Sequence, residues 1–205
     1  LHMYIYMIPS LIVLDDFYVN VDDVRNFALS QNFDVKGNYP GNRTKSFTSA
    51  EMKDFLDSKI SNLIGKITLW PMEPESYNGS FQYATSREKT WIHVDSNNNW
   101  AAVVYLTPDA PLSGGTAIFR HKKHGTVRNW YHNSPLSKEV NDDLGRDSQD
   151  YTKWEIVDRI GNVYNRMILF DSTQYHASVD YFGTELKDSR LFQVFFFDTE
   201  LKVAR

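Results

Sequence analysis

The sequence has 205 residues, of which 41% are hydrophobic and 15% aromatic, and its formal net charge is -4. This size and composition fit one globular domain with a sizeable core, and the charge gives no basic field that would favour nucleic acid as a partner. The chain contains 0 Cys, which excludes disulfides, thiolate metal sites and a cysteine nucleophile. We therefore expect a soluble, cytoplasmic protein.

The first 70 residues are expected to form a helical support. The start LHMYIYMIPSLIVL is apolar but short, lacks a basic flank and contains Pro9, so we expect neither a membrane span nor a signal peptide. A strand is expected over residues 11–19 and a short helix over 22–30. The pattern Thr48-Ser-Ala-Glu51 predicts a capping box, followed by a helix that ends at Gly65.

From residue 71 the chain is rich in aromatic and β-branched residues, in short runs separated by Gly, Pro, Asn and Asp. The runs are SFQYAT, TWIHV, WAAVVYLT, GTAIFRH, WEIVDRI, RMILFD, HASVDYF and RLFQVFFFDTE. This number of strands is typical of a jelly roll. We therefore expect a single domain, 1–205, with a mainly β core over 71–205. The polar residues 134–150 are expected to form a mobile surface loop.

The candidate site begins with His93 and Asp95 in TWIHVDSNNNW. In a strand both side chains would face the same way, although this motif alone could be a structural His beside a surface Asp. His176 follows an apolar run further on, and Arg190 opens an aromatic-rich one. Two His and one carboxylate form the facial triad of non-haem Fe(II) oxygenases, and a buried Arg needs an anion. The alternative for Arg190 is a solvated strand end.

The order of these motifs resembles that of the Fe(II)/2-oxoglutarate-dependent oxygenase superfamily, in its prolyl-4-hydroxylase-like branch. The matching positions, from 83 to 198, are Tyr83, His93-x-Asp95, Tyr105-Leu106, Gly114-Gly115-Thr116, Phe170-Asp171, His176 and Arg190. The whole chain also resembles a second group of related sequences, through Tyr39-Pro40-Gly41-x-Arg43, Tyr164-Asn165-Arg166 and the start of the last strand. The resemblance implies a double-stranded β-helix, a cupin-like form of jelly roll, with the N-terminal helices packed outside.

The resemblance also implies site residues. His93, Asp95 and His176 would bind Fe(II), and Arg190 would bind the 5-carboxylate of 2-oxoglutarate. Further residues expected to line the cosubstrate site are Tyr83, Tyr105 and Thr116. The Gly pair before Thr116 would make room where strands and ligand crowd together. The segment between His176 and Arg190 is longer than in prolyl hydroxylases, which leaves Arg166 as an alternative for the carboxylate.

The implied activity is that of a dioxygenase that uses O2 and 2-oxoglutarate and releases succinate and CO2. It would hydroxylate an unactivated C–H bond of an amino-acid, peptidyl or small-molecule substrate, with neither nucleic acid nor membrane as a partner. Two alternatives stay open. One is a cupin-like metal-dependent isomerase or binding protein that does not use 2-oxoglutarate. The other is a non-catalytic interaction domain in which the same residues form a polar network.

His121 and His124 lie in the basic segment FRHKKHG. We expect a solvated basic turn, and the alternative is a second metal site. The turn could also form a positive rim that attracts an anionic substrate.

Overall fold

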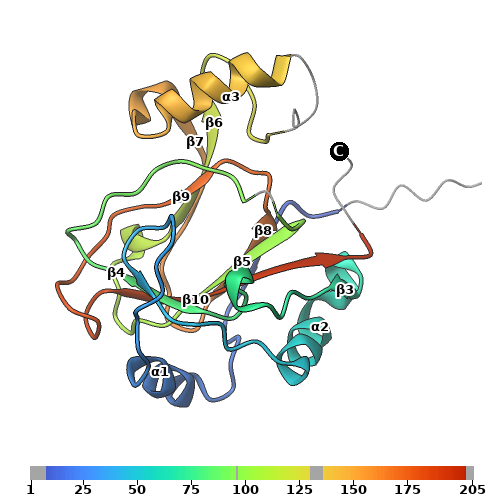
Figure 1. Ribbon diagram of the computed structural model, residues 1–205, viewed down its shortest axis with the longest axis vertical. Coiled ribbons are helices and arrows are strands. Elements are labelled where there is room, and N and C mark those ends of the chain that lie inside the picture. Colours follow the sequence, from blue (N-terminus) through green and yellow to red (C-terminus); the bar gives the residue numbers. More distant parts are fainter. Residues whose placement is uncertain (1–7, 96, 130–135, 202–205) are drawn as a thin grey trace, which may run out of the picture.

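The computed structural model describes residues 8–95, 97–129 and 136–201, in which two antiparallel β-sheets face each other (Figure 1). The larger sheet has the order β1-β8-β5-β10-β4-β2, with β3 paired to β10, and the smaller has the order β7-β6-β9. The strands are β1 (Leu11–Leu14), β2 (Asn42–Arg43), β3 (Ile67–Leu69), β4 (Phe81–Ala84), β5 (Trp100–Tyr105), β6 (Thr116–His121), β7 (Trp154–Ile160), β8 (Met167–Asp171), β9 (His176–Ser178) and β10 (Arg190–Thr199). The helices are α1 (Val21–Leu29), α2 (Ala50–Ile64) and α3 (Leu136–Asp147), with 3-10 turns η1 (Pro74–Ser76), η2 (Leu112–Gly114) and η3 (Tyr151–Lys153).

Strand alternation divides the apolar residues of the larger sheet between two cores. In β5, Trp100 and Val104 pack with the helices α1 and α2, whereas Ala101 and Tyr105 face the smaller sheet. The strand β10 divides in the same way. Its residues facing the helices are Leu191, Phe195 and Phe197, and those facing the smaller sheet are Phe192 and Val194. Figure 1 shows α1 and α2 on the outer side of the larger sheet.

The helix α2 confirms the helix expected up to Gly65, with a correction at its start. The N-cap is Ser49, whose hydroxyl accepts a hydrogen bond from the backbone N–H of Met52 at 3.2 Å. The capping box expected from Thr48 is therefore wrong by one residue. Gly65 ends the helix with φ 77, a conformation that glycine adopts without a steric penalty.

Ile60 on α2 is fully buried against the larger sheet, which gives a direct test of this packing. Ile60→Ala is expected to lower the free energy of unfolding by roughly 2–5 kcal/mol, because the methyl groups lost leave a cavity. Urea unfolding measures the loss. Leu63→Ala on the same helix is the control: Leu63 is 43% exposed, so its loss should stay below about 1 kcal/mol. Equal losses from the two variants would contradict the packing described.

Seven of the eight expected β runs contain the strands β4 to β10. The exception is TWIHV, where the only ladder contact is an isolated bridge between His93 and His176. The expected strand 11–19 ends at Leu14, because the chain turns at Asp16, which has φ 52. The strands β1, β2 and β3 also join the larger sheet, so the first 70 residues contribute strands as well as helices.

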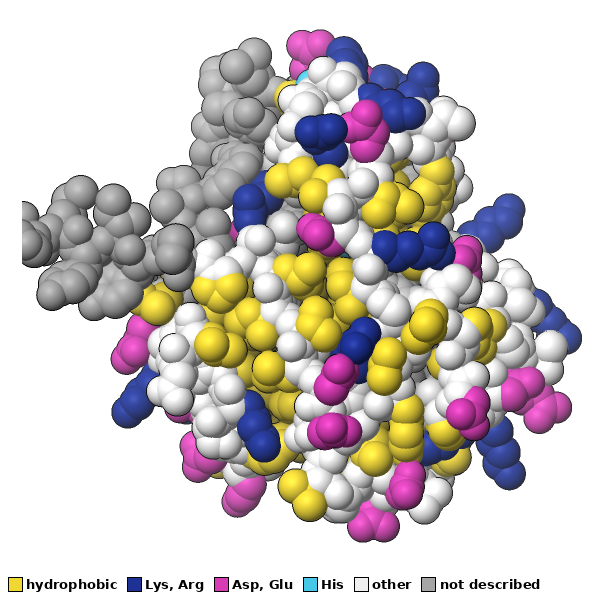
Figure 2. All heavy atoms as spheres, turned by 180° about the vertical axis from the view of Figure 1, so that it is seen from behind, with side chains coloured by type: hydrophobic (Ala, Val, Ile, Leu, Met, Phe, Trp, Pro, Cys, Tyr) yellow, Lys and Arg dark blue, Asp and Glu magenta, His cyan; other side chains and the backbone are white. Residues whose placement is uncertain are grey.

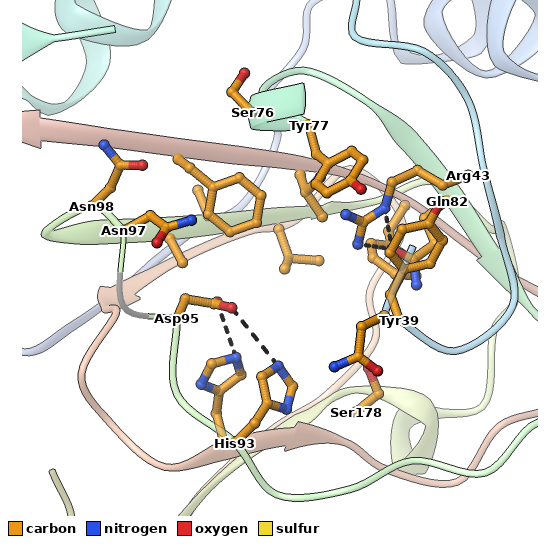
Figure 3. Close-up of a pocket in the computed structure, with 18 of the residues that line it drawn as sticks. Tyr39, Arg43, Ser76, Tyr77, Gln82, His93, Asp95, Asn97, Asn98 and Ser178 are labelled. Atoms are coloured by element: carbon orange, nitrogen blue, oxygen red, sulfur yellow. Dashed lines mark hydrogen bonds and ion pairs between the residues drawn. The ribbon is translucent and has the colours of Figure 1, made fainter. Parts of the chain in front are cut away.

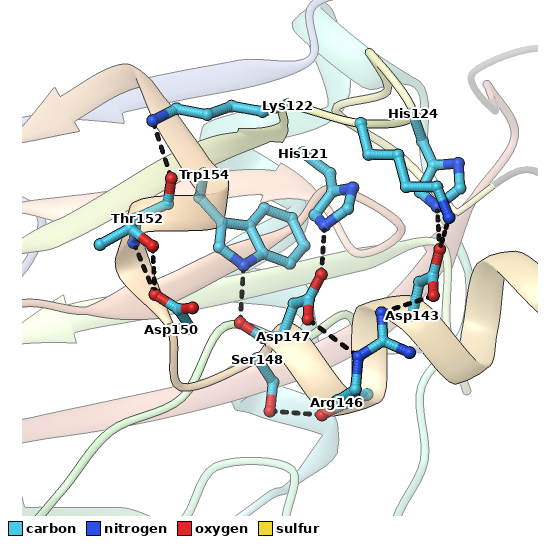
Figure 4. A network of polar contacts seen from close by, with 12 residues as sticks. His121, Lys122, His124, Asp143, Arg146, Asp147, Ser148, Asp150, Thr152 and Trp154 are labelled. Atoms are coloured by element: carbon cyan, nitrogen blue, oxygen red, sulfur yellow. Dashed lines mark hydrogen bonds and ion pairs between the residues drawn. The ribbon is translucent and has the colours of Figure 1, made fainter.

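The helix α3 replaces the mobile loop expected over 134–150. It covers a small core through Val140 and Leu144, while its acidic residues bind the FRHKKHG segment. The Nε2 atom of His121 lies 3.1 Å from Asp147 Oδ2 and that of His124 lies 2.9 Å from Asp143 Oδ2 (Figure 4).

The expected solvated basic turn is correct for Lys122 and Lys123, which are exposed, and wrong for His121, which is 1% exposed. Asp143 is already bound by Lys123 and Arg146 as well as by His124. We interpret this cluster as the structural attachment of α3 and not as a second metal site.

The surface shows both signs of charge. On the face in Figure 2, basic and acidic side chains are interspersed with apolar ones, in keeping with the small net charge. Across the described ranges, no helix is both long and apolar enough to cross a membrane.

Candidate metal and cosubstrate site

A cavity of about 810 Å³ lies between the two sheets. Its walls come from both of them: Val103 and Phe192 belong to the larger sheet, and Thr116 and Ser178 belong to the smaller. The sequence-predicted site residues that line it are His93, Asp95, Thr116, His176 and Arg190. This volume lies in the range of about 300–1,000 Å³ found for ligand pockets. The cavity therefore joins residues that are far apart in the sequence.

His93, Asp95 and His176 meet at one point of this cavity (Figure 3). The Nε2 atom of His176 lies 3.3 Å from Asp95 Oδ2, and that of His93 lies 3.9 Å from Asp95 Oδ1. The three ligand atoms lie within 4.8 Å of one another, and no other group of this kind occurs among the residues that the structure describes. Metal bonds of about 2.0–2.2 Å place neighbouring ligand atoms roughly 3 Å from one another. Side-chain rotations that close the cluster by about 1–2 Å would therefore let one ion bind all three residues.

Backbone hydrogen bonds hold these residues in place although they belong to no long strand. The N–H groups of His93 and His176 each donate to the carbonyl of the other residue, at 3.0 and 2.9 Å, and the N–H of Asp95 donates to Ser172 O at 2.8 Å. The side chains of His93 and Asp95 converge because of this pairing. The expectation that they face the same way is confirmed, but the regular strand behind that expectation is not.

Both imidazole rings are oriented for metal binding. The Nδ1 of His93 lies 3.0 Å from Trp91 O, and the Nδ1 of His176 lies 2.9 Å from Gln174 O. A carbonyl oxygen can only accept, so Nδ1 carries the hydrogen in each ring. Each Nε2 therefore keeps its lone pair for an ion, in the arrangement typical of metal-bound histidine.

The protonation states also suit a metal. Burial, and then the neighbouring His176, lowers the pKa of His93 to about 4, so this ring is neutral at pH 7. Burial raises the pKa of Asp95, but the nearby His176, His93 and Arg43 outweigh burial and lower it below its usual value. Neutral imidazole and ionised carboxylate are the forms that bind metal ions. The donor set suits Fe(II), with positions left open.

Arg190 is a buried cation with no acid beside it. Its side chain is 1% exposed, and its Nε donates to Gly114 O at 3.0 Å. Its Nη2 donates to Thr116 Oγ1 at 3.2 Å, and Nη1 has no partner in the described part of the chain. None of the described carboxylates lies within 4 Å of the guanidinium. Such a charge is costly unless an anion binds it, so the geometry favours an anion at Nη1.

Tyr105 and Thr116 support Arg190 from the side. The hydroxyl of Tyr105 donates to Thr116 Oγ1 at 2.8 Å, and its ring lies 5.3 Å from the Arg190 guanidinium carbon. Burial raises the pKa of Tyr105, so its phenol stays protonated and acts as the donor. Because Thr116 Oγ1 accepts from both neighbours, its own hydrogen can point to a ligand.

The Gly114-Gly115 pair is needed for packing within the protein more than for ligand binding. A Cβ on Gly115 would lie 1.8 Å from Ile160 O, so a side chain there would clash with β7. The carbonyls of both glycines accept hydrogen bonds from Arg190. The expected role of these glycines in making room for the ligand is thus corrected, since the crowding comes from Ile160 and, at Gly114, from Phe182.

Tyr83 does not line the cavity. It packs against Phe33 with the ring centroids 5.0 Å apart, on the helix side of the sheet. The cosubstrate role expected for Tyr83 is therefore wrong, because strand alternation turns its neighbour Gln82 to the cavity instead. The sequence signal that could have indicated this is the pairing of a polar Gln with apolar neighbours in SFQYAT.

Arg166, the alternative for the 5-carboxylate, lies outside the cavity. Its Nε and Nη2 atoms donate to the two carboxylate oxygens of Asp15 at 2.6 and 3.0 Å. Among the described ion pairs, Arg166 contacts neither Asp171 nor Asp158. Asp171 accepts a hydrogen bond from Arg128 at 3.0 Å. Arg190 is thus the better placed of the two arginines.

Sequence reasoning missed several cavity residues on the segments 38–43 and 71–98. They include Tyr39, Arg43, Tyr77, Gln82 and Asn98. The motif Tyr39-Pro40-Gly41-x-Arg43 is the one sequence signal that pointed to this wall of the cavity. Asn97 to Asn99 form a bend, anchored where the N–H of Asn99 donates to Asp198 Oδ1 at 2.8 Å.

Solved structures resemble this chain over most of its length. HygX from Streptomyces hygroscopicus, with nickel and 2-oxoglutarate bound, has a TM-score of 0.60 and 12% sequence identity, covering 93% of this chain and 83% of that one. A prolyl hydroxylase from Trichoplax adhaerens, in complex with a peptide fragment of the hypoxia inducible factor oxygen degradation domain, has a TM-score of 0.52 and 12% identity, covering 92% of this chain and 84% of that one. No curated protein sequence matches the chain.

The chain thus has the same fold as HygX and this prolyl hydroxylase. The chain belongs to DUF6445, described as a family of unknown function, whose model matches residues 6–184. That match includes the three metal-binding candidates but ends before Arg190.

Proposed function

We propose that the chain is a non-haem Fe(II)- and 2-oxoglutarate-dependent dioxygenase. The observation that carries the proposal is that one cavity holds both the His93, Asp95 and His176 cluster and the unpartnered guanidinium of Arg190. The two sheets would correspond to the halves of a double-stranded β-helix, in one domain over 1–205. A cytoplasmic location belongs to the same proposal.

Each residue has a definite task. His93, Asp95 and His176 would hold Fe(II) through two Nε2 atoms and a carboxylate oxygen. When bound, Fe(II) supplies the chemistry in which 2-oxoglutarate and dioxygen yield succinate, CO2 and an oxidised substrate. Arg190 would bind the 5-carboxylate through Nη1, with the hydroxyl of Thr116 as a second donor. The apolar walls at Val103 and Phe192 would limit the water around the ligands.

The substrate reaction we favour is hydroxylation of an unactivated C–H bond. HygX has been seen with hygromycin B bound, and the Trichoplax enzyme with a peptide, so this fold accommodates ligands of both kinds. The cavity has room for a small molecule or a single side chain beside the cosubstrate.

The test is 2-oxoglutarate turnover by the purified chain. Protein loaded anaerobically with Fe(II) and then exposed to air should release succinate from 2-oxoglutarate, even slowly and without a substrate. Omitting the metal or adding a chelator should stop the release. Absence of both metal binding and succinate release would overturn the proposal.

The two alternatives fit the site less well. A cupin-like isomerase or binding protein has no use for Arg190, which a purely structural role would leave with a buried, unpaired Nη1. A non-catalytic polar network would not require both Nε2 atoms to converge on one carboxylate.

Arg166 provides a negative control for the cosubstrate site. Arg166→Gln breaks the pair with Asp15, a residue that is itself half exposed, and a long hydrogen bond of 3.4 Å from Arg166 Nη1 to Gly161 O. The loss of stability should be at most about 1 kcal/mol, as for other surface ion pairs. The dissociation constant of 2-oxoglutarate, measured by calorimetry on Mn(II)-loaded protein, should stay close to that of the wild type. A large increase would instead favour Arg166 as the carboxylate ligand.

A further inference from the structure

Arg43 is a second buried arginine in the cavity. It lies on the edge strand β2 and is 8% exposed. Its guanidinium carbon lies 3.8 Å from the ring centroid of Tyr39 and 4.8 Å from that of Tyr77. Two aromatic rings thus fix the plane of the guanidinium without neutralising its charge.

Gln82 orients the same group. The Nε and Nη2 atoms of Arg43 both donate to Gln82 Oε1, the first at 2.8 Å, and Gln82 Nε2 donates to Pro40 O at 2.6 Å. These two bonds use two of the five N–H groups. In the described part of the chain Nη1 has no hydrogen-bond partner, and in Figure 3 the guanidinium points into the cavity.

The charge of Arg43 is not balanced by a neighbouring acid. Among the described residues, no carboxylate lies within 4 Å of it. Burial lowers the pKa of Arg43 to about 10, which still leaves it protonated at pH 7. Asp95 is the carboxylate whose charge acts to raise the pKa of Arg43, and the proposed function assigns that carboxylate to the metal.

When the charges of the proposed site are counted, Arg43 has no partner of opposite charge. The two positive charges of the ion and the single charge of Arg190 balance the charge of Asp95 and the two charges of 2-oxoglutarate. Arg43 and Arg190 are the only Lys or Arg side chains among the described residues of the cavity wall. Glu73 and Glu75 also line the cavity, but neither forms an ion pair with Arg43, so Arg43 is the one cation of this described wall to which the proposed site gives no partner.

The two arginines occupy different parts of the cavity wall. Arg43 pairs with Gln82 across β2 and β4, and Gln82 pairs with Phe192 across β4 and β10. Arg190 lies on β10 itself, with its guanidinium carbon 4.3 Å from the Phe192 ring centroid. Neighbouring strands are about 4.8 Å apart, so β2 lies roughly 10 Å from β10. Arg43 is thus placed for a group other than the cosubstrate.

We propose that Arg43 binds a carboxylate of the substrate, which makes the substrate an amino acid, an N-acyl amino acid or the C-terminal residue of a peptide. This inference rests on the proposed function. The free edge of a guanidinium matches the two oxygens of a carboxylate. A dianionic phosphate is less suitable, because Arg43 offers a single charge and Glu73 and Glu75 also line the cavity.

The experiment compares acids with their amides. Fe(II)-loaded protein with 2-oxoglutarate is tested for succinate release with the common amino acids as free acids, as N-acetyl acids and as carboxamides. Tripeptides with free or amidated C-termini form a second arm, which separates a peptide source from a small-molecule source. For the best acid, kcat/KM should exceed that of its amide by roughly ten- to hundredfold, the effect expected of one charge-assisted pair.

Two variants test Arg43 itself. Arg43→Gln should reduce the acid-to-amide ratio to about one. Gln82→Glu keeps the side-chain size and the acceptor for Arg43 but places a carboxylate against it, so it should reduce the same ratio even if Arg43→Gln folds poorly. The matched control is Arg120→Gln, because Arg120 is exposed and pairs with Glu155 at 2.6 Å outside the cavity. It should keep the wild-type ratio.

The outcomes separate this inference from the proposed function. The dissociation constant of 2-oxoglutarate should rise no more than about threefold in Arg43→Gln, since the 5-carboxylate is assigned to Arg190. A loss of 2-oxoglutarate binding as large as that of Arg190→Met would overturn the inference and leave the proposed function intact. The inference is equally overturned if amides match acids, or if no acid stimulates a protein that turns over 2-oxoglutarate. A wild type that releases no succinate at all overturns both.

Discussion

His176→Ala is expected to abolish metal binding and, with it, all succinate release. The variant removes one of the three ligand atoms that lie within 4.8 Å of one another. Loss of a group that merely orients a ligand weakens metal binding by about 10–100-fold, so loss of a ligand itself should exceed that range. Mn(II) binding followed by electron paramagnetic resonance measures the affinity, and succinate release measures the activity.

The control for this variant is His124→Ala. His124 also binds a carboxylate, that of Asp143, but it lies under α3 and away from the cavity. Its replacement should leave Mn(II) affinity unchanged. Metal-free His176→Ala should still unfold cooperatively, but at a lower temperature than the metal-free wild type, because the buried ring packs against Phe170 and His93. Undiminished Mn(II) binding by His176→Ala would show that the cluster is not the metal site.

The strands of the cavity were predictable because burial on two faces leaves a clear sequence pattern. RLFQVFFFDTE and WAAVVYLT are apolar on both faces, and they form β10 and β5 in the middle of the larger sheet. His176 and Arg190 could be assigned from their positions at the ends of such runs. These predictions depend on local composition, which one sequence provides.

Other parts depend on contacts that the local pattern does not contain. The helix α3 is polar on most of its surface, and its apolar contacts are those of Val140 and Leu144. Its sequence therefore predicts a loop. Its attachment relies on ion pairs with FRHKKHG, a segment distant in sequence. Tyr83 was assigned in place of Gln82 because the family pattern gives the position but not the face of the strand.

The choice between Arg190 and Arg166 shows the same limit. Both precede apolar strands, and nothing in the sequence ties Arg166 to Asp15. In the structure the residues between His176 and Arg190 form a turn in which Asp188 accepts hydrogen bonds from the N–H groups of Thr184 and Glu185, at 2.9 and 2.8 Å. This turn absorbs the extra length and lets β10 begin with Arg190 in the cavity.

Arg190→Met is expected to remove most of the affinity for 2-oxoglutarate while leaving metal binding intact. A hydrogen bond to a charged group contributes about 1.5–3 kcal/mol, so losing one such bond should raise the dissociation constant roughly 10- to 150-fold. Methionine fills a similar volume beside Tyr105 and Phe192 and adds no buried charge. Calorimetric titration of Mn(II)-loaded protein with 2-oxoglutarate measures the change.

Thermal stability gives an independent measurement of the same site. At a concentration of 100 times its dissociation constant, a ligand stabilises the native state by about 2.7 kcal/mol. For a domain of this size that corresponds to a rise in melting temperature of roughly 5–11 °C. Metal-loaded wild type and Arg166→Gln should show this rise with 2-oxoglutarate, and Arg190→Met should show little of it at the same concentration. An equal rise in all three proteins would mean that the unpartnered Nη1 of Arg190 is not where the cosubstrate binds.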